Sequence, residues 1–178
     1  MKKVFMVVLI VLSLVGCSSL KVNVDYDPDY DFSAPRSYAI AHHARAGEDT
    51  LFNDRLIKAL NEELAVKGYV QVPKQEAQLI FVFHTNVVDK TEIDTDYEMI
   101  GYGRYGFGGH MIATTSTYNY TEGTLILDAL NPQNQKIVWR GTATDILSKK
   151  KSPEERTAYV KKVVHKTMQD FPPKSERK

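Results

Sequence analysis

Apolar residues recur every three or four positions in two stretches of the chain, a spacing that places them on one face of an α-helix. The first stretch carries Phe52, Leu56, Leu60 and Leu64. Asp49 or Thr50 can cap its start, and Gly68, directly after Lys67, suits a left-handed C-terminal cap. We therefore predict an amphipathic helix from about residue 50 to Lys67.

The second helical stretch lies near the C-terminus. Ser152-Pro153-Glu154-Glu155 supplies a serine cap, a proline at the first helical position and a glutamate three residues after the cap. The predicted buried stripe of this helix is Val160, Val163, Val164, Met168 and Phe171. Pro172-Pro173 ends the helix, and a charged tail follows over residues 174–178.

Runs of β-forming residues predict the strands between and before these helices. They cover residues 20–26, 36–41, 69–72, 79–83, 112–120, 124–130 and 136–147. The run over 79–83 is continuously apolar, which favours a central strand, and Trp139 is expected in the core. Residues 21–173 therefore form a single α+β domain, a mainly antiparallel β-sheet with two amphipathic helices packed on one face.

The N-terminus has the pattern of an export signal. Lys2 and Lys3 precede an apolar run over residues 4–12, which is shorter than the about 20 residues needed to cross a membrane. Leu14-Val15-Gly16-Cys17 follows, and a small residue directly before cysteine at this place resembles the lipobox of bacterial lipoproteins. The alternative is an ordinary signal peptide that contains an incidental cysteine.

The lipobox resemblance implies that residues 1–16 are removed and that Cys17 is acylated on its sulfur and its new amine. Residues 17–20 then form a lipidated tether, and the membrane is a partner through the acyl chains. Cys17 is the only cysteine in the chain, so lipidation also accounts for an exported thiol. Ser18, where an aspartate would signal inner-membrane retention, favours the outer membrane facing the periplasm.

Charge and residue content argue against nucleic-acid binding and catalysis. The formal net charge is +1 at pH 7, without the basic excess that nucleic-acid binding needs. The chain has neither a G-x-S-x-G nor an H-E-x-x-H motif, and its five histidines are scattered. We therefore expect a protein that is not an enzyme and has no cofactor. A hydrolase that uses two carboxylates, whose geometry is invisible in sequence, is the less favoured alternative.

A glycine-rich segment in the middle of the chain has the glycine spacing of a nucleotide-binding loop. Gly101, Gly103 and Gly106 spell G-x-G-x-x-G, but a phosphate loop needs a strand before it and a helix opening within it. Residues 94–98 before it are acidic, and residues 112–120 after it have the composition of a strand. The segment is therefore predicted to be a loop.

Aromatic side chains make this loop a candidate contact surface for a protein or a glycan. The candidate contact residues are Tyr97, Tyr102, Arg104, Tyr105 and Phe107. The other interpretation is a mobile hairpin tip that binds nothing.

Two acidic series space their oxygens by two residues, as calcium loops do. Neither the series that starts at Asp25 nor the one that starts at Asp94 has the glycine at position six and the glutamate at position twelve that such loops require. We predict caps, turns and solvated surface for both series, and no metal site.

Several short stretches together resemble an uncharacterised family of bacterial lipoproteins, the domain of unknown function 4136. They are Val24-Asp25-Tyr26-Asp27, Asp31-Phe32-Ser33 with Tyr38, Lys67-Gly68-Tyr69, Glu122-Gly123-Thr124-Leu125, Val138-Trp139-Arg140-Gly141 and Phe171-Pro172-Pro173. The resemblance implies an envelope location and a single α+β domain, but no activity and no catalytic residues. We expect a lipid-anchored binding or scaffold module, with a peptidoglycan-binding module or a purely structural lipoprotein as alternatives.

Overall fold

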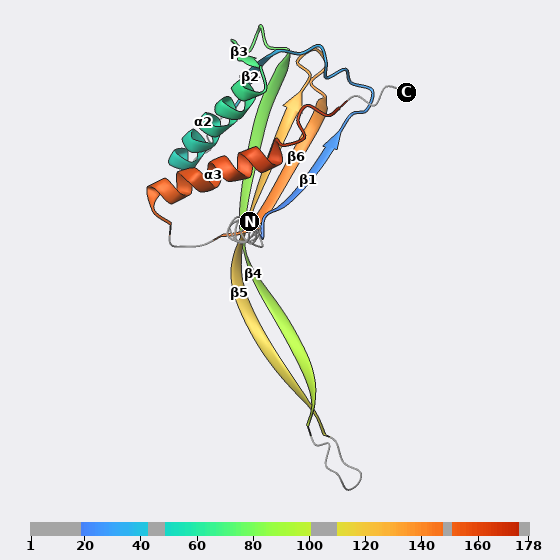
Figure 1. The fold of residues 1–178 in the computed structure, drawn as a ribbon, viewed down its shortest axis with the longest axis vertical. Coiled ribbons are helices and arrows are strands. Elements are labelled where there is room, and N and C mark those ends of the chain that lie inside the picture. Colours follow the sequence, from blue (N-terminus) through green and yellow to red (C-terminus); the bar gives the residue numbers. More distant parts are fainter. Residues whose placement is uncertain (1–18, 43–48, 101–109, 148–150, 175–178) are drawn as a thin grey trace, which may run out of the picture.

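The computed structural model describes residues 19–42, 49–100, 110–147 and 151–174. They form a six-stranded sheet, the helices α2 and α3, and the segments that connect them. In chain order the elements are β1 (Lys21–Tyr26), β2 (Ser37–Ile40), α2 (Thr50–Val66), β3 (Val70–Gln71), β4 (Leu79–Ile100), β5 (His110–Leu130), β6 (Ile137–Ile146) and α3 (Pro153–Thr167). Both helices cover the same face of the sheet (Figure 1). The predicted α+β fold is confirmed.

The sheet is mainly antiparallel, as predicted, but it is mixed, because one edge contains parallel pairs. The strand order is β1-β6-β5-β4-β2-β3, and the pairs β1–β6, β6–β5 and β5–β4 are antiparallel. Strand β2 instead runs parallel to β3 and β4. Helix α2 follows β2 in the chain and supplies the crossover that parallel neighbours require.

Both helices begin where the capping residues predict, and α2 also ends there. Helix α3 ends at Thr167, before the expected stop at Pro172-Pro173, so Met168 and Phe171 of the predicted stripe follow the helix. The Asp49 side chain accepts a hydrogen bond from the Phe52 amide at 3.0 Å, and Gly68 has a φ of 82° just after α2. Ser152 and Glu155 form the predicted reciprocal capping box of α3. These caps satisfy backbone groups that the helix ends would otherwise leave unpaired.

The core lies between the helices and the covered face of the sheet. Trp139 is fully buried, as predicted, and all five residues of the predicted α3 stripe are buried. The Phe171 ring lies among four other aromatic rings, with its centre 5.1 Å from Trp139, 5.4 Å from Phe81, 5.6 Å from Tyr69 and 6.3 Å from Phe32. The segment after α3 therefore closes the core.

Strands β4 and β5 differ most from the sequence prediction. The short strand expected at 79–83 continues to Ile100, and the two strands expected at 112–120 and 124–130 form the single strand β5. Gly123 does not interrupt β5, because it pairs with Val87 on one side and Asp145 on the other. Beyond the domain, β4 and β5 continue as a long two-stranded ribbon (Figure 1).

Candidate functional site

The ribbon is the most distinctive surface of the described structure. Strand β6 pairs with β5 only as far as Glu122, and β2 pairs with β4 only as far as Phe81. Residues 90–100 of β4 and 110–120 of β5 therefore pair as strands only with each other, and we call them the β4–β5 arm. At a rise of about 3.4 Å per residue, the arm extends roughly 35–40 Å.

One face of the arm carries a ladder of hydroxyl and amide groups, which we call the threonine face. Thr91 Oγ1 donates to Asn119 Oδ1 at 2.8 Å, and the Thr95 and Thr115 hydroxyl oxygens are 3.3 Å apart. Ile93 and Tyr97 extend from the same face, because alternate residues of a strand share a face. Cross-strand hydrogen bonds thus stabilise a face that no other helix or strand of the described residues covers.

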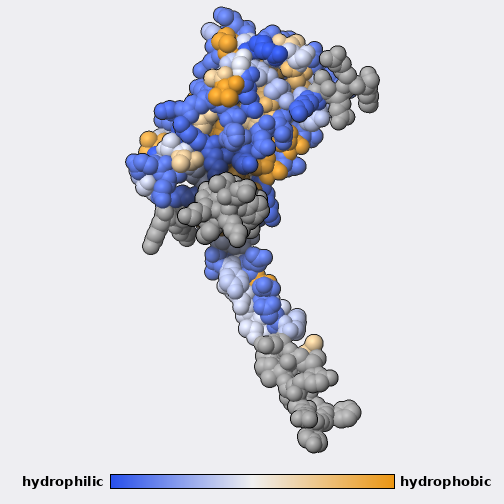
Figure 2. Space-filling view, in the orientation of Figure 1, coloured by the Kyte–Doolittle hydropathy of each residue, from blue (hydrophilic) through white to orange (hydrophobic). Residues whose placement is uncertain are grey.

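The opposite face of the arm is acidic. Glu92, Asp94 and Asp96 lie on it at every second position of β4, opposite Tyr118, Ser116 and Thr114 of β5. Residues 90–100 and 110–120 contain four acids and one lysine, a net charge of −3. The arm is therefore a predominantly polar surface (Figure 2), with exposed tyrosines on both faces.

The structure places part of the predicted contact surface. Tyr97 is 70% exposed and lies in strand β4 rather than in a loop, because the pairing of β4 with β5 continues past it. Tyr102, Arg104, Tyr105 and Phe107 lie outside the described residues, as does Cys17. Tyr118, 59% exposed, lies on the opposite face of the arm from Tyr97. The sequence predicts its strand over residues 112–120, but Tyr118 is not among the predicted contact residues.

Two properties of the arm favour contact with a partner. An isolated two-stranded ribbon is marginally stable in water, because it has no face on which to bury side chains. Each arm strand also has an outer edge whose backbone groups pair with no further strand of the described chain. Such edges are templates for the addition of another strand.

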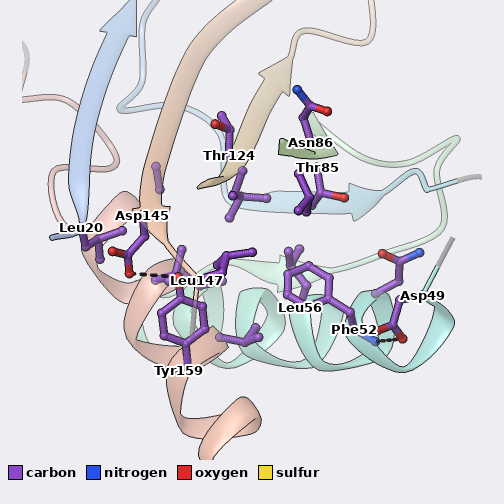
Figure 3. Close-up of a pocket in the computed structure, with 18 residues that line it drawn as sticks. Leu20, Asp49, Phe52, Leu56, Thr85, Asn86, Thr124, Asp145, Leu147 and Tyr159 are labelled. Atoms are coloured by element: carbon purple, nitrogen blue, oxygen red, sulfur yellow. Dashed lines mark hydrogen bonds between the residues drawn. The ribbon is translucent and has the colours of Figure 1, made fainter. Parts of the chain in front are cut away.

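A second candidate site is a cavity of about 360 Å³ at the base of the arm. Phe52 and Leu56 of α2 and Val163 of α3 line it from the helices, and Thr85 of β4 and Leu125 of β5 line it from the sheet (Figure 3). It lies between the helices and the sheet, where β4 and β5 leave the domain. Its volume is within the range of small-molecule binding sites.

Polar side chains lie at both ends of this cavity, Asp49 at one end and Asp145 with Tyr159 at the other (Figure 3). Tyr159 Oη donates a hydrogen bond to Asp145 Oδ2 at 3.0 Å, and Ser19 Oγ donates to Asp145 Oδ1. Burial, and then the hydrogen bond and charge of Asp145, raise the pKa of the Tyr159 hydroxyl. Leu20 lines the cavity beside this cluster. The chain that leads into β1 therefore passes the end of the cavity at which Asp145 lies.

Residues of the first acidic series and His165 have partners within the domain. Asp27 and Asp31 accept hydrogen bonds from the amides of Asp29 and Ser33, as turn-forming aspartates do. His165 Nδ1 lies 3.0 Å from Glu63 Oε2, an α3–α2 contact. Within the described ranges, no group of three or more His, Cys, Asp or Glu side chains could hold a metal ion.

The family comparison agrees with the resemblance seen in the sequence. A family model described as Domain of unknown function (DUF4136) matches residues 22–173. The chain belongs to this family. The match spans β1 to the segment after α3, and so includes the arm and the cavity. A search of curated proteins found no match.

A solved structure of low sequence identity shares the fold of this DUF4136 chain. A PDZ domain protein from Parabacteroides distasonis matches with a TM-score of 0.54 and 14% identity over 88% of this chain. The chain corresponds to only 36% of that protein's length. The PelC dodecamer from Paraburkholderia phytofirmans matches with a TM-score of 0.42 and 11% identity, over 84% of this chain and 94% of that chain. At these identities the likeness concerns the fold alone. Within the described parts of the chain, no helix is both long and apolar enough to span a membrane.

Proposed function

We propose that this protein is a non-enzymatic, lipid-anchored binding or scaffold module of the bacterial cell envelope, which contacts another envelope component through the β4–β5 arm. The observation that carries the proposal is the arm, a polar ribbon that no other described element covers. A ribbon of this length gains little stability within its own chain, so contact with a partner is the simplest physical reason for it.

The anchor and the arm belong to the same end of the domain. Lys21 of β1 pairs with Thr144, and Glu122 at the arm base pairs with Ile146, two residues further along β6. Cys17 lies two residues before Ser19, so at most about 7 Å of extended chain separates them. With acyl chains on Cys17, the arm would begin close to the membrane surface. The proposed location is the outer membrane, facing the periplasm, as Ser18 suggests.

Site-specific photo-crosslinking in intact cell envelopes tests the contact. A photoreactive residue at Tyr97 samples the threonine face, and one at Tyr118 samples the acidic face. The control position is Val66, which is 85% exposed at the end of α2. We expect discrete crosslinked products from at least one arm position and only background from Val66. Equal background at all three positions would overturn the contact role.

Peptidoglycan is the second candidate partner, favoured by the exposed tyrosines, since aromatic side chains offer large amphipathic contact areas. Purified sacculi should then co-sediment the protein, and the double variant Tyr97→Ala and Tyr118→Ala should lose this binding. A protein scaffold should not co-sediment.

A further inference from the structure

The cavity between the helices and the sheet has a ligand chemistry that the arm does not explain. Its walls are mostly apolar side chains, including Phe52, Leu56, Leu125, Val160 and Val163. The hydrogen-bonded groups Asp145 and Tyr159 occupy one end of it. A mostly apolar cavity whose polar groups lie at its ends suits a linear hydrocarbon chain whose polar end stays near one of these ends, such as that of Asp145.

The position of the N-terminal segment identifies the source of that chain. Leu20 lines the cavity, and Ser19 is hydrogen-bonded to Asp145 at one end of it. The chain therefore enters the domain beside the cavity, through Ser19 and Leu20. Cys17 is only two residues further back, within about 7 Å of chain. Its acyl groups, more than 10 carbons long in a membrane anchor, would reach the cavity easily.

We propose that the cavity holds one acyl chain of the protein's own lipidated Cys17, while the remaining chains stay in the membrane. This inference rests on the lipid anchor in the proposed function. Two inserted acyl chains suffice for stable anchoring, whereas one anchors only marginally. A triacylated cysteine can therefore keep two chains in the membrane while the third lies elsewhere. Seating that chain in the cavity fixes the domain, and with it the base of the arm, against the membrane surface.

Metabolic labelling with a diazirine-bearing palmitate tests the proposal on the full-length lipidated protein. After photolysis in membranes, mass spectrometry of the peptides locates the crosslinks. We expect them on cavity residues, with Phe52, Leu56 and Val163 as the diagnostic positions. Crosslinks to phospholipid alone, with none on these residues, would overturn the proposal.

A pair of variants on β4 provides the matched control. Thr85 lines the cavity and is exposed, so Thr85→Trp should fill the entrance, whereas His84→Trp adds the same side chain on the opposite face of the strand. Displacing two methylene groups from an apolar site should lower intramolecular crosslinking about tenfold in Thr85→Trp. His84→Trp should leave it unchanged. Equal crosslinking in the two variants, at matched melting temperatures, would contradict an acyl chain in the cavity.

Binding of cis-parinaric acid distinguishes the protein's own chain from a free fatty acid. The fluorescent acid should bind Cys17→Ala, which has no acyl group, and should not bind the lipidated protein, whose cavity is filled. Equal binding to both forms, or to neither, would overturn occupancy by the anchor. The mass of the N-terminal peptide separates the two proposals. An unmodified Cys17 removes the lipid anchor itself, whereas an acylated Cys17 without cavity crosslinks removes only this inference.

Discussion

Strands β4 and β5 pass through two regions of opposite character, the core of the domain and the arm. In the domain, Leu79, Phe81 and Leu127 are at most 1% exposed, whereas Ile93 in the arm is 67% exposed on the same strand as Leu79. Full burial of a large apolar side chain contributes about 1.5–3 kcal/mol, and a favourable cross-strand pair only about 0.2–1 kcal/mol. The domain therefore fixes the register, and the arm continues it with little stability of its own.

This difference has a functional meaning, because the two regions are under different constraints. The core half of β4 and β5 must keep its apolar side chains to fold. The arm half can carry acids, threonines and exposed tyrosines without cost to the core, and these are the groups that a binding surface uses. Substitutions that act on one region and not on the other test this separation most directly.

The largest effect is expected from truncating a core residue of β4, with a matched truncation in the arm. Leu79 and Ile93 have isomeric side chains on the same side of one strand. We expect Leu79→Ala to lower the free energy of unfolding by about 2–5 kcal/mol, and Ile93→Ala to change it by less than about 0.5 kcal/mol. Urea unfolding followed by circular dichroism measures both. Similar losses in the two variants would mean that the arm shares the core's stability.

Two glycines test how tightly the chain is packed in the core and near the base of the arm. A Cβ added at Gly141 would lie 2.5 Å from Thr167 Cγ2 and 2.6 Å from Trp139 Cη2, both in the core. At Gly123, near the arm base, its three nearest neighbours would be atoms of the Leu147 side chain, at 2.9 Å or more. We expect Gly141→Ala to cost about 1–3 kcal/mol of overpacking, and Gly123→Ala clearly less, because Leu147 can move. The opposite order of melting temperatures would contradict this account of the core.

Alkaline pH should act on the domain through Tyr159. Burial first, and then Asp145, raise the pKa of its hydroxyl above the usual 10.0. A group whose pKa is raised by folding stabilises the folded state fully below its unfolded-state pKa, and this stability is lost as the pH rises above about 10. Tyr159→Phe should therefore weaken the fall in stability above pH 10. Ile93→Ala, which removes no titrating group, should keep the full fall, and an unchanged profile in Tyr159→Phe would refute the linkage.

Local signals explain which elements the sequence predicts well. Caps and helical periodicity involve residues within one or two turns of each other, so Asp49, Gly68 and Ser152 mark the helix ends correctly. The apolar run at 79–83 likewise identifies a central strand. These features depend on neighbours in the chain, which are visible in a single sequence.

The arm and the cavity depend on partners that are distant in the sequence. Aspartate is disfavoured in strands, so Asp94 and Asp96 do not indicate one, yet β5 pairs with them across the ribbon and overrides their propensity. The parallel pairing of β2 likewise follows from the path of α2. One cavity is lined by residues from five segments of the chain, Leu20, Phe52, Thr85, Asp145 and Tyr159. No pattern of neighbouring residues in the sequence predicts that these side chains lie together.

The smallest expected effect is confined to the arm. Thr91→Val keeps the branched shape but removes the hydrogen bond to Asn119, whereas Thr91→Ser keeps the hydroxyl. A cross-strand pair contributes about 0.2–1 kcal/mol, so amide hydrogen exchange in the arm should accelerate by at most about fivefold in Thr91→Val. Exchange in the domain should stay unchanged in both variants, because the core does not depend on this pair. If Thr91→Val accelerated exchange equally in the arm and in the core half of β4, the two regions would open as one unit, and the arm could not adapt to a partner independently of the domain.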